Sequence, residues 1–240
     1  MRKIEILYPE LGNLFGDLFN MDYLRQCLPE AEYIQTRSNE TPRFAQEDVD
    51  MIYIGPMPEY AQELTVQKLM PLKARLEELI EKGTVILAAG NAQEIFGSYI
   101  ENDDGSKIEC LGIFDAYAKR KMMDRFNTPF CGTMKDGDET IRVVGFKSQF
   151  TQMYGNNEDG YVFDVEKGCG LNRDSKKEGL RRNNFIGTNV LGPIMIMNPP
   201  FTRYIMRLLG EEAPRVAFEE DAEACYRIRL DEFEKMTVEV

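Results

Sequence analysis

A short apolar segment near the middle of the chain constrains the fold more than any other feature. It reads Thr84-Val-Ile-Leu-Ala-Ala89 and is followed at once by Gly90 and Asn91. An apolar run without polar alternation is typical of a strand that is buried on both faces of a parallel sheet. Glycine permits a tight turn after such a strand, and we expect a helix from Ala92 to Tyr99. The segment therefore predicts a strand–turn–helix unit at the centre of an α/β domain.

The residues on either side of this unit extend the same interpretation. Apolar runs and polar–apolar alternation indicate strands, and apolar residues at helical spacing indicate helices. The expected strands are residues 3–8, 32–35 and 50–55, and the expected helices are 13–27, 59–82 and 199–209. Between about residues 108 and 190 the pattern changes to short β-like runs separated by Gly, Asn and Asp. This order predicts an α/β fold with a mainly parallel central sheet and a β-rich second half.

The chain lacks histidine, and this absence excludes several kinds of active site. Its 240 residues include five cysteines, no tryptophan and no histidine. A Ser-His-Asp triad, a Cys-His pair and every histidine-ligated metal site are therefore impossible. The cysteines are odd in number, widely spaced and without a Cys-x-x-Cys pair, which is typical of reduced thiols in the cytoplasm. We expect a cytoplasmic protein without a metal site or a cofactor.

The charge of the chain is acidic and unevenly distributed. With 41 acidic and 29 basic residues the net charge is −12, which argues against nucleic-acid binding because that depends on Lys and Arg. No apolar run approaches the roughly 20 residues of a membrane span, and the opening residues indicate a strand rather than a signal peptide. Ten of the acids and only four bases lie in residues 211–240. We therefore expect one domain over residues 1–210 and an acidic, partly helical extension over 211–240 that packs on it.

Several short motifs occur in an order that resembles a known family. They are residues 7–17, 54–55, the turn at 86–99, and residues 111–115, 145–146, 186–193 and 198–199. Together they are similar, over residues 4–209, to the class I glutamine amidotransferase domain of the cobyric acid synthase type. The subfamily that amidates the cell-wall precursor lipid II is the most similar. The resemblance implies a flavodoxin-like three-layer sandwich, a cysteine that forms a thioester with the glutamine side chain and releases ammonia, and a histidine as general base.

This chain departs from the family pattern at both chemical positions. Matched without gaps, the family's Cys-Gly-Gly-Tyr-Gln-Leu-Leu-Gly segment ends at Gly97 and places Gly90 at the nucleophile. The Gly-Thr-Tyr-Leu-His-Gly-Pro segment places Leu191 at the base, and a Gly-Phe-Glu-Asn-His segment places Gln149 at a second histidine. Glycine cannot attack an amide and leucine cannot accept a proton. No catalytic residue is therefore assigned, and Gly90 is expected at backbone angles that strain other residues.

Gly55, Asn91 and Gln149 remain as candidate binding residues of the crevice. Glu94 stands at the family's glutamine position and is a candidate to face the same pocket. For Glu94 we favour a solvated carboxylate in the first turn of a helix, where the helix dipole stabilises it. Cys169, which lies between two glycines, is expected to be the most exposed of the cysteines in the β-rich half.

These observations predict a catalytically degenerate amidotransferase-like protein that acts as a binding or structural subunit. The resemblance implies an ATP-dependent amide ligase of the Mur-ligase type as a partner, and self-association to a homo-oligomer is a further option. Two alternatives stay open: an active amidotransferase or amidohydrolase with a non-standard nucleophile, and a sensor that binds glutamine or another amide without cleaving it. Two close carboxylates or a thiol in the crevice would favour the enzyme. A crevice plugged by Leu191 would favour a scaffold, whereas a sensor needs an open pocket.

Overall fold

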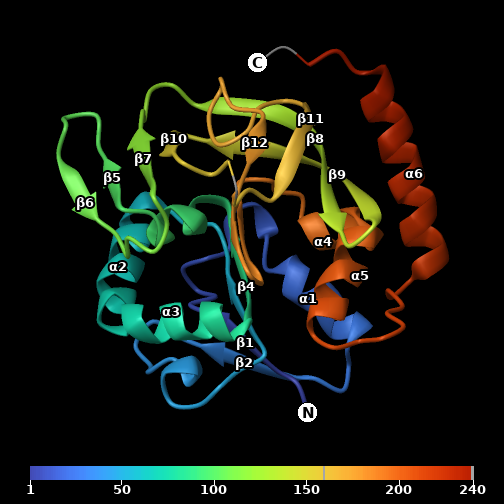
Figure 1. Ribbon diagram of the computed structural model, residues 1–240, viewed down its shortest axis with the longest axis horizontal. Coiled ribbons are helices and arrows are strands. Elements are labelled where there is room, and N and C mark those ends of the chain that lie inside the picture. The colour runs from blue at the N-terminus through green and yellow to red at the C-terminus, as the bar shows by residue number, and fades with distance from the viewer. Residues whose placement is uncertain (159, 239–240) are drawn as a thin grey trace.

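A six-stranded sheet forms the centre of the computed structural model, which describes residues 1–158 and 160–238 (Figure 1). Its strands, in chain order, are β1 (Lys3–Leu7), β2 (Glu32–Thr36), β3 (Met51–Ile54), β4 (Val85–Ala89), β13 (Leu180–Arg182) and β14 (Phe185–Thr188). They lie in the order β13-β14-β4-β3-β1-β2, and only β13 is antiparallel to its neighbour. This confirms the predicted α/β class with a mainly parallel sheet.

The sheet is covered on both faces because its central strands are apolar on both. Successive side chains of a strand point to opposite faces. Ile52 and Ile86 therefore join the core beneath helices α2 (Glu59–Leu69) and α3 (Lys73–Lys82). Tyr53 and Leu87 join the opposite core, which helices α1 (Phe19–Cys27), α4 (Ile194–Met197) and α5 (Pro199–Leu208) cover. The continuously apolar segment before Gly90 is thus β4, buried along its whole length.

Three expected helices differ from the structure. The helix expected over 59–82 is divided by the 3-10 turn η3 (Met70–Leu72), because Pro71 lacks the N–H that an uninterrupted helix requires. The helix expected over 13–27 is divided into the 3-10 turn η1 (Leu14–Gly16) and α1, and Phe15 adopts a φ of 61° between them. A further 3-10 turn, η2 (Arg43–Ala45), lies in the predicted loop.

The third difference lies directly after the tight turn. Residues Gly90–Phe96 form the 3-10 helix η4 instead of the start of an α-helix that reaches Tyr99. Gly97 is extended, and the N–H of Ser98 donates to the carbonyl of Ala116 at 2.6 Å. The chain leaves the helix there because the next residues pair with a second sheet.

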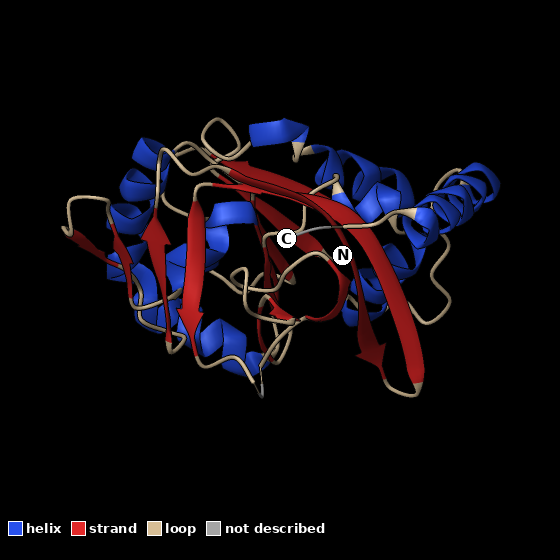
Figure 2. Cartoon of the chain, turned by 90° about the horizontal axis from the view of Figure 1, so that it is seen from above, coloured by secondary structure: helices blue, strands red, loops and turns tan. Residues whose placement is uncertain are grey.

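Two antiparallel-rich sheets make up the β-rich second half, as predicted (Figure 2). One contains β5 (Tyr99–Glu101), β6 (Lys107–Glu109), β7 (Ala116–Arg120) and β10 (Thr151–Gly155). The other contains β8 (Phe126–Asp136), β9 (Glu139–Gln149), β11 (Phe163–Lys167) and β12 (Lys177–Glu178). The chain passes from β9 to β10 at Phe150, beside the carboxyl end of the central sheet. The sequence pattern indicated short strands in this half of the chain but did not place β7, β8 or β10.

The acidic extension contains helix α6 (Glu219–Lys235), which lies beside α4, α5 and β9 (Figure 1). The hydroxyl of Tyr226 donates to the carbonyl of Arg142 at 2.6 Å, and Arg203 pairs with Glu219 and Glu223 at 3.0 and 2.7 Å. Glu239, one of the acids counted above, lies outside the described residues. No helix in the described part of the chain is long and apolar enough to cross a membrane.

Candidate functional site

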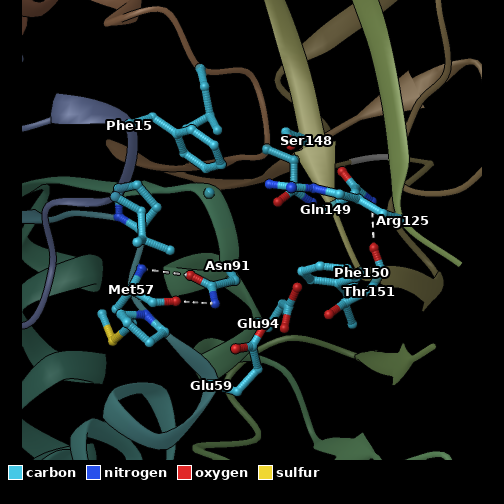
Figure 3. Close-up of a pocket in the computed structure, with 16 residues that line it drawn as sticks. Phe15, Met57, Glu59, Asn91, Glu94, Arg125, Ser148, Gln149, Phe150 and Thr151 are labelled. Carbon is cyan, nitrogen blue, oxygen red and sulfur yellow. Dashed lines mark hydrogen bonds between the residues drawn. The ribbon is translucent and has the colours of Figure 1, made fainter. Parts of the chain in front are cut away.

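A cavity of about 300 Å³ lies at the carboxyl ends of β3 and β4, between the central sheet and the β9–β10 connection (Figure 3). In an α/β sheet this edge is where ligands usually bind. Its lining residues are Leu14, Phe15, Pro56, Met57, Pro58, Glu59, Gly90, Asn91, Glu94, Arg125, Ser148, Gln149, Phe150, Thr151, Asn189 and Leu191. The fold therefore brings the turn after β4 together with segments from five other parts of the chain.

Gly90 stands at the turn in a conformation that favours glycine. Its φ is +59°, in the left-handed region where a β-carbon is strained. An added β-carbon would lie 2.6 Å from Cβ of Pro56, which is closer than two carbon atoms can approach without movement. Strain at Gly90 was expected from the motif, and the positive φ agrees with it. The turn thus has a left-handed backbone at Gly90 and carries no side chain there.

Leu191 faces the same space. An added β-carbon on Gly90 would be 3.5 Å from Cδ2 of Leu191, an ordinary van der Waals contact. The backbone of Leu191 is fixed by two hydrogen bonds with Phe146, of 2.9 and 3.1 Å. The side chain is buried at 2% exposure, yet it forms part of the cavity wall and does not close the cavity. The two positions that the motifs matched to nucleophile and base are therefore neighbours.

The loop after β3 offers few backbone donors to this cavity. Pro56 and Pro58 have no N–H, and the N–H of Met57 donates to Oδ1 of Asn91 at 3.0 Å. Nδ2 of Asn91 in turn donates to the carbonyl of Met57 at 2.8 Å (Figure 3). Asn91 thus lines the cavity as expected, but its side chain ties the turn to this loop.

Gly55, the third candidate binding residue, is not among the lining residues. An added β-carbon on Gly55 would lie 2.2 Å from the carbonyl oxygen of Gly12. The two glycines allow the loops after β1 and β3 to approach closely. Gly55 therefore allows the close packing of these two loops, and the next residues, Pro56 and Met57, line the cavity.

Glu94 is buried, so the favoured expectation of a solvated carboxylate is wrong. It lines the cavity at 1% exposure because η4 turns its side chain inward. The pKa of its carboxyl is raised to about 7, mainly by burial. The hydrogen bond from Gln62 and the charge of Arg120 act to lower this pKa, and the charge of Glu59 acts to raise it. The site therefore holds a carboxyl group that titrates near neutral pH.

A polar network lies behind Glu94. Nε2 of Gln62 donates to Oε2 of Glu94 at 2.9 Å and to the carbonyl of Asn91 at 2.6 Å. Oε1 of Gln62 accepts a hydrogen bond from Arg120 at 2.7 Å. The sequence analysis missed Gln62 and Arg120, because they come from α2 and β7 and no local motif relates them to the turn.

Gln149 lies at the end of β9 and lines the cavity, as expected of a binding residue. It is 7% exposed, and its Nε2 donates to the carbonyl of Thr151. Arg125 lies near it in Figure 3, with its guanidinium carbon 5.1 Å from the centre of the Phe150 ring. The structure thus brings together Gly90, Asn91, Gln149 and Leu191.

No cysteine is among the residues that line the cavity. Cys169 was expected to be exposed and is instead 1% exposed, because Gly168 and Gly170 pack their backbones against neighbouring carbonyls. Burial raises the pKa of the Cys110 thiol to about 12 and that of Cys131 to about 11. Over residues 1–158 and 160–238, no group of three or more acidic or cysteine side chains is placed to hold a metal ion.

Comparison with known proteins agrees with this architecture. Residues 3–196 match the CobB/CobQ-like glutamine amidotransferase domain, so the chain belongs to that family. Two curated relatives are the GatD subunits of lipid II isoglutaminyl synthase (glutamine-hydrolysing). The one from Staphylococcus aureus is 29% identical over 196 residues, which cover 81% of this chain and 78% of the relative. The one from Streptococcus pneumoniae is 25% identical over 203 residues, covering 82% and 75%.

Two crystal structures of glutamine amidotransferases share the fold. One superposes with a TM-score of 0.53 at 12% identity and covers 86% of this chain and 99% of the other. The second, from Thermotoga maritima, gives a TM-score of 0.50 at 13% identity and covers 95% and 92%. At such low identity they establish the fold alone.

Proposed function

We propose that this chain is an amidotransferase-family subunit that binds a small ligand and does not hydrolyse glutamine. The observation that carries the proposal is Gly90, which occupies the turn after β4 with a φ of +59° and without a side chain. Glutamine hydrolysis by the cysteine and histidine of the family pattern needs a thiolate that attacks the carboxamide carbon and a base that takes the thiol proton. Leu191, the residue that faces Gly90, cannot serve as that base.

The surroundings of Gly90 support the same proposal. An attacked amide develops negative charge on its oxygen, which enzymes stabilise with backbone N–H groups. Pro56 and Pro58 lack this donor, and the donor of Met57 is engaged by Asn91. Loss of one such donor alone lowers kcat by about 10²–10³-fold. A cavity of about 300 Å³ is nevertheless present, which favours binding over a purely structural role.

The partner we propose is an ATP-dependent amide ligase of the Mur-ligase type in the cytoplasm. The support is the likeness to two proteins that are named as synthase subunits. Residues 211–240 would belong to the same body as residues 1–210, since α6 packs on α4, α5 and β9. Co-expression with such a ligase should give a stable complex, whose mass by light scattering also reveals self-association.

A second candidate function is an amidohydrolase that uses carboxylates. Glu59 and Glu94 both line the cavity, and the charge of Glu59 raises the pKa of Glu94. A carboxylate with a pKa near 7 is suited to general-base catalysis. Two carboxylates in the crevice are the feature that the sequence analysis named as favouring an enzyme. The scarcity of backbone N–H donors on the loop after β3 argues against this function.

Ammonia release from glutamine decides between the two functions. We expect purified protein, alone and with its ligase, to release no ammonia above the buffer background. Hydrolysis that Glu94→Gln abolishes would establish the carboxylate enzyme instead. Hydrolysis that Gln149→Ala or Cys169→Ala abolishes would also overturn the proposal and would point to a different catalytic group.

A further inference from the structure

Two buried oxygen atoms on the cavity wall have no hydrogen-bond partner in the described part of the chain. They are Oε1 of Glu94 and Oε1 of Gln149. The other polar atom of each side chain is engaged, Oε2 of Glu94 by Gln62 and Nε2 of Gln149 by the carbonyl of Thr151. Buried polar atoms are nearly always paired, with protein, ligand or water. When Glu94 is ionised both atoms are acceptors, and the group that would satisfy them is then a hydrogen-bond donor.

The charges around Glu94 favour a cationic donor. Glu59 lines the same cavity and is close enough to raise the pKa of Glu94 by its charge. Arg120 stands behind Glu94 and its charge lowers the pKa of that carboxyl, but its two terminal nitrogens donate to Gln62, Glu63 and Asn102 at 2.7, 2.8 and 3.0 Å, so that Glu63 shares its charge. The thiol of Cys110 lies near Glu94 as well, and its raised pKa keeps it neutral. When Glu94 is ionised, the three carboxylates of Glu59, Glu63 and Glu94 therefore outnumber the one guanidinium of Arg120 at this end of the cavity.

The rest of the cavity wall is mostly apolar. Leu14, Phe15, Phe150 and Leu191 contribute to it, and Phe15 is 45% exposed at the opening (Figure 3). Arg125, an exposed residue that also lines the cavity, is held above the Phe150 ring. A ligand that matches both ends has a small cationic head and a short apolar tail.

Resting on the non-hydrolysing function proposed above, we infer that the cavity binds a small primary amine. Its ammonium group would donate to Oε1 of Glu94 and Oε1 of Gln149, and its tail would contact Phe15 and Leu191. An ammonium group has three N–H donors and a positive charge. A neutral carboxamide has two donors and leaves the carboxylates uncompensated, and a carboxylate would be repelled.

Thermal unfolding and calorimetric titration with n-butylammonium chloride test this inference. Butyramide is the neutral control of similar shape, sodium butyrate the anionic one, and potassium chloride controls for ionic strength. At pH 8 we expect n-butylammonium to raise the melting temperature and the other three to have no effect beyond that of salt. An equal rise with butyramide, an equal rise with potassium chloride, or no rise at all would each overturn the inference.

The pH dependence provides an independent readout. The ammonium group stays protonated between pH 6 and 8, whereas Glu94, with a pKa of about 7, changes from mostly neutral to mostly ionised. Binding should therefore be roughly tenfold tighter at pH 8 than at pH 6. Affinity that is unchanged between these two pH values would contradict a contact with Glu94.

Variants locate the site. Glu94→Gln should weaken n-butylammonium binding at pH 8 by at least tenfold and remove its pH dependence, and Gln149→Leu should weaken it without removing that dependence. The matched control is Glu77→Gln on α3, outside the cavity lining. If Glu94→Gln does not fold, Gln149→Leu still tests the site. Ammonia release from glutamine, measured on the same preparations, tests the proposed function separately.

Discussion

Leu191 lies next to Gly90 in the cavity wall, since a β-carbon on Gly90 would lie 3.5 Å from Cδ2 of Leu191. The two residues lie far apart in the sequence and come from different loops at the carboxyl edge of the sheet. The two positions that the motifs matched to a nucleophile and a base are therefore adjacent in the structure. Substitutions at these two positions and at their neighbours test how tightly this part of the cavity wall is packed.

Gly90 should tolerate a side chain less well than a glycine of the same backbone conformation in open space. Gly137, in the β8–β9 turn, has a φ of +58° and no atom within 4 Å of an added β-carbon. Gly137→Ala should cost about 1 kcal/mol of unfolding free energy from the backbone alone. Gly90→Ala should cost an additional 1–3 kcal/mol or so, because of the contact with Pro56. Chemical denaturation of both variants measures the difference, and equal costs would show that Pro56 moves aside easily.

Introducing a cysteine at Gly90 and a histidine at Leu191 should not produce glutamine hydrolysis. In the double variant Gly90→Cys/Leu191→His the β-carbon of the new cysteine would still meet Pro56, and the N–H of Met57 would still be bonded to Asn91. We expect ammonia release to stay at background. The control is the same double variant with Pro56→Gly added, which removes the obstructing side chain and supplies an N–H. Full activity of the double variant by itself would show that the β3 loop does not restrict the chemistry.

Glu94 should make the protein less stable as the pH rises. Its pKa is about 7 in the folded state and 4.5 is its ordinary value, so the folded state holds the proton more tightly. The stability associated with this carboxyl is present below about pH 4.5 and is lost as the pH rises to about 7, by about 3 kcal/mol at most. Glu94→Gln should flatten the pH dependence of the unfolding free energy over this range. Glu77→Gln is the matched control and should leave the slope unchanged.

Removing one partner of the ion pair between Lys147 and Glu178 should strongly lower the free energy of unfolding. Both side chains are fully buried, and Nζ of Lys147 lies 2.7 Å from Oε2 of Glu178. Lys147→Met leaves the carboxylate buried without its cation and should cost about 3–5 kcal/mol. The double variant Lys147→Met/Glu178→Gln should recover much of this loss, as measured by chemical denaturation. A double variant as unstable as the single one would mean that packing, not charge, dominates the effect.

Lys167 should hold the last turn of α6. Its Nζ donates to the carbonyls of Phe233, Glu234 and Met236, the last two at 2.9 and 2.7 Å. A cation at the carboxyl end of a helix pairs with otherwise unbonded carbonyl groups and with the helix dipole. Lys167→Met should speed amide hydrogen exchange in the last turn of α6 and leave α5 unchanged. Lys68→Met on α2 serves as the control, and unchanged exchange in α6 would contradict this role.

Local sequence patterns predicted the central strand β4, but they did not predict where the side chains around the turn after β4 lie. The apolar run before Gly90 indicated β4 because both faces of a central strand must be apolar. Glu94 was placed wrongly because the segment was expected to be an α-helix with its first turn in solvent. In the 3-10 helix η4 the residue points inward, where Gln62 and Arg120 meet it. Those partners depend on α2 and β7, and no spacing within the turn reveals them.

The sequence by itself determined the family, the α/β class and the absence of histidine. These follow from residue identities and from periodicity, which are local properties. Only the tertiary structure decided that the crevice is open, that Gly55 lies outside it, and that Glu94 and Gln149 each direct a buried, unpaired oxygen toward it. The reason is physical: burial, and with it pKa and hydrogen-bond satisfaction, depends on which distant segments pack together.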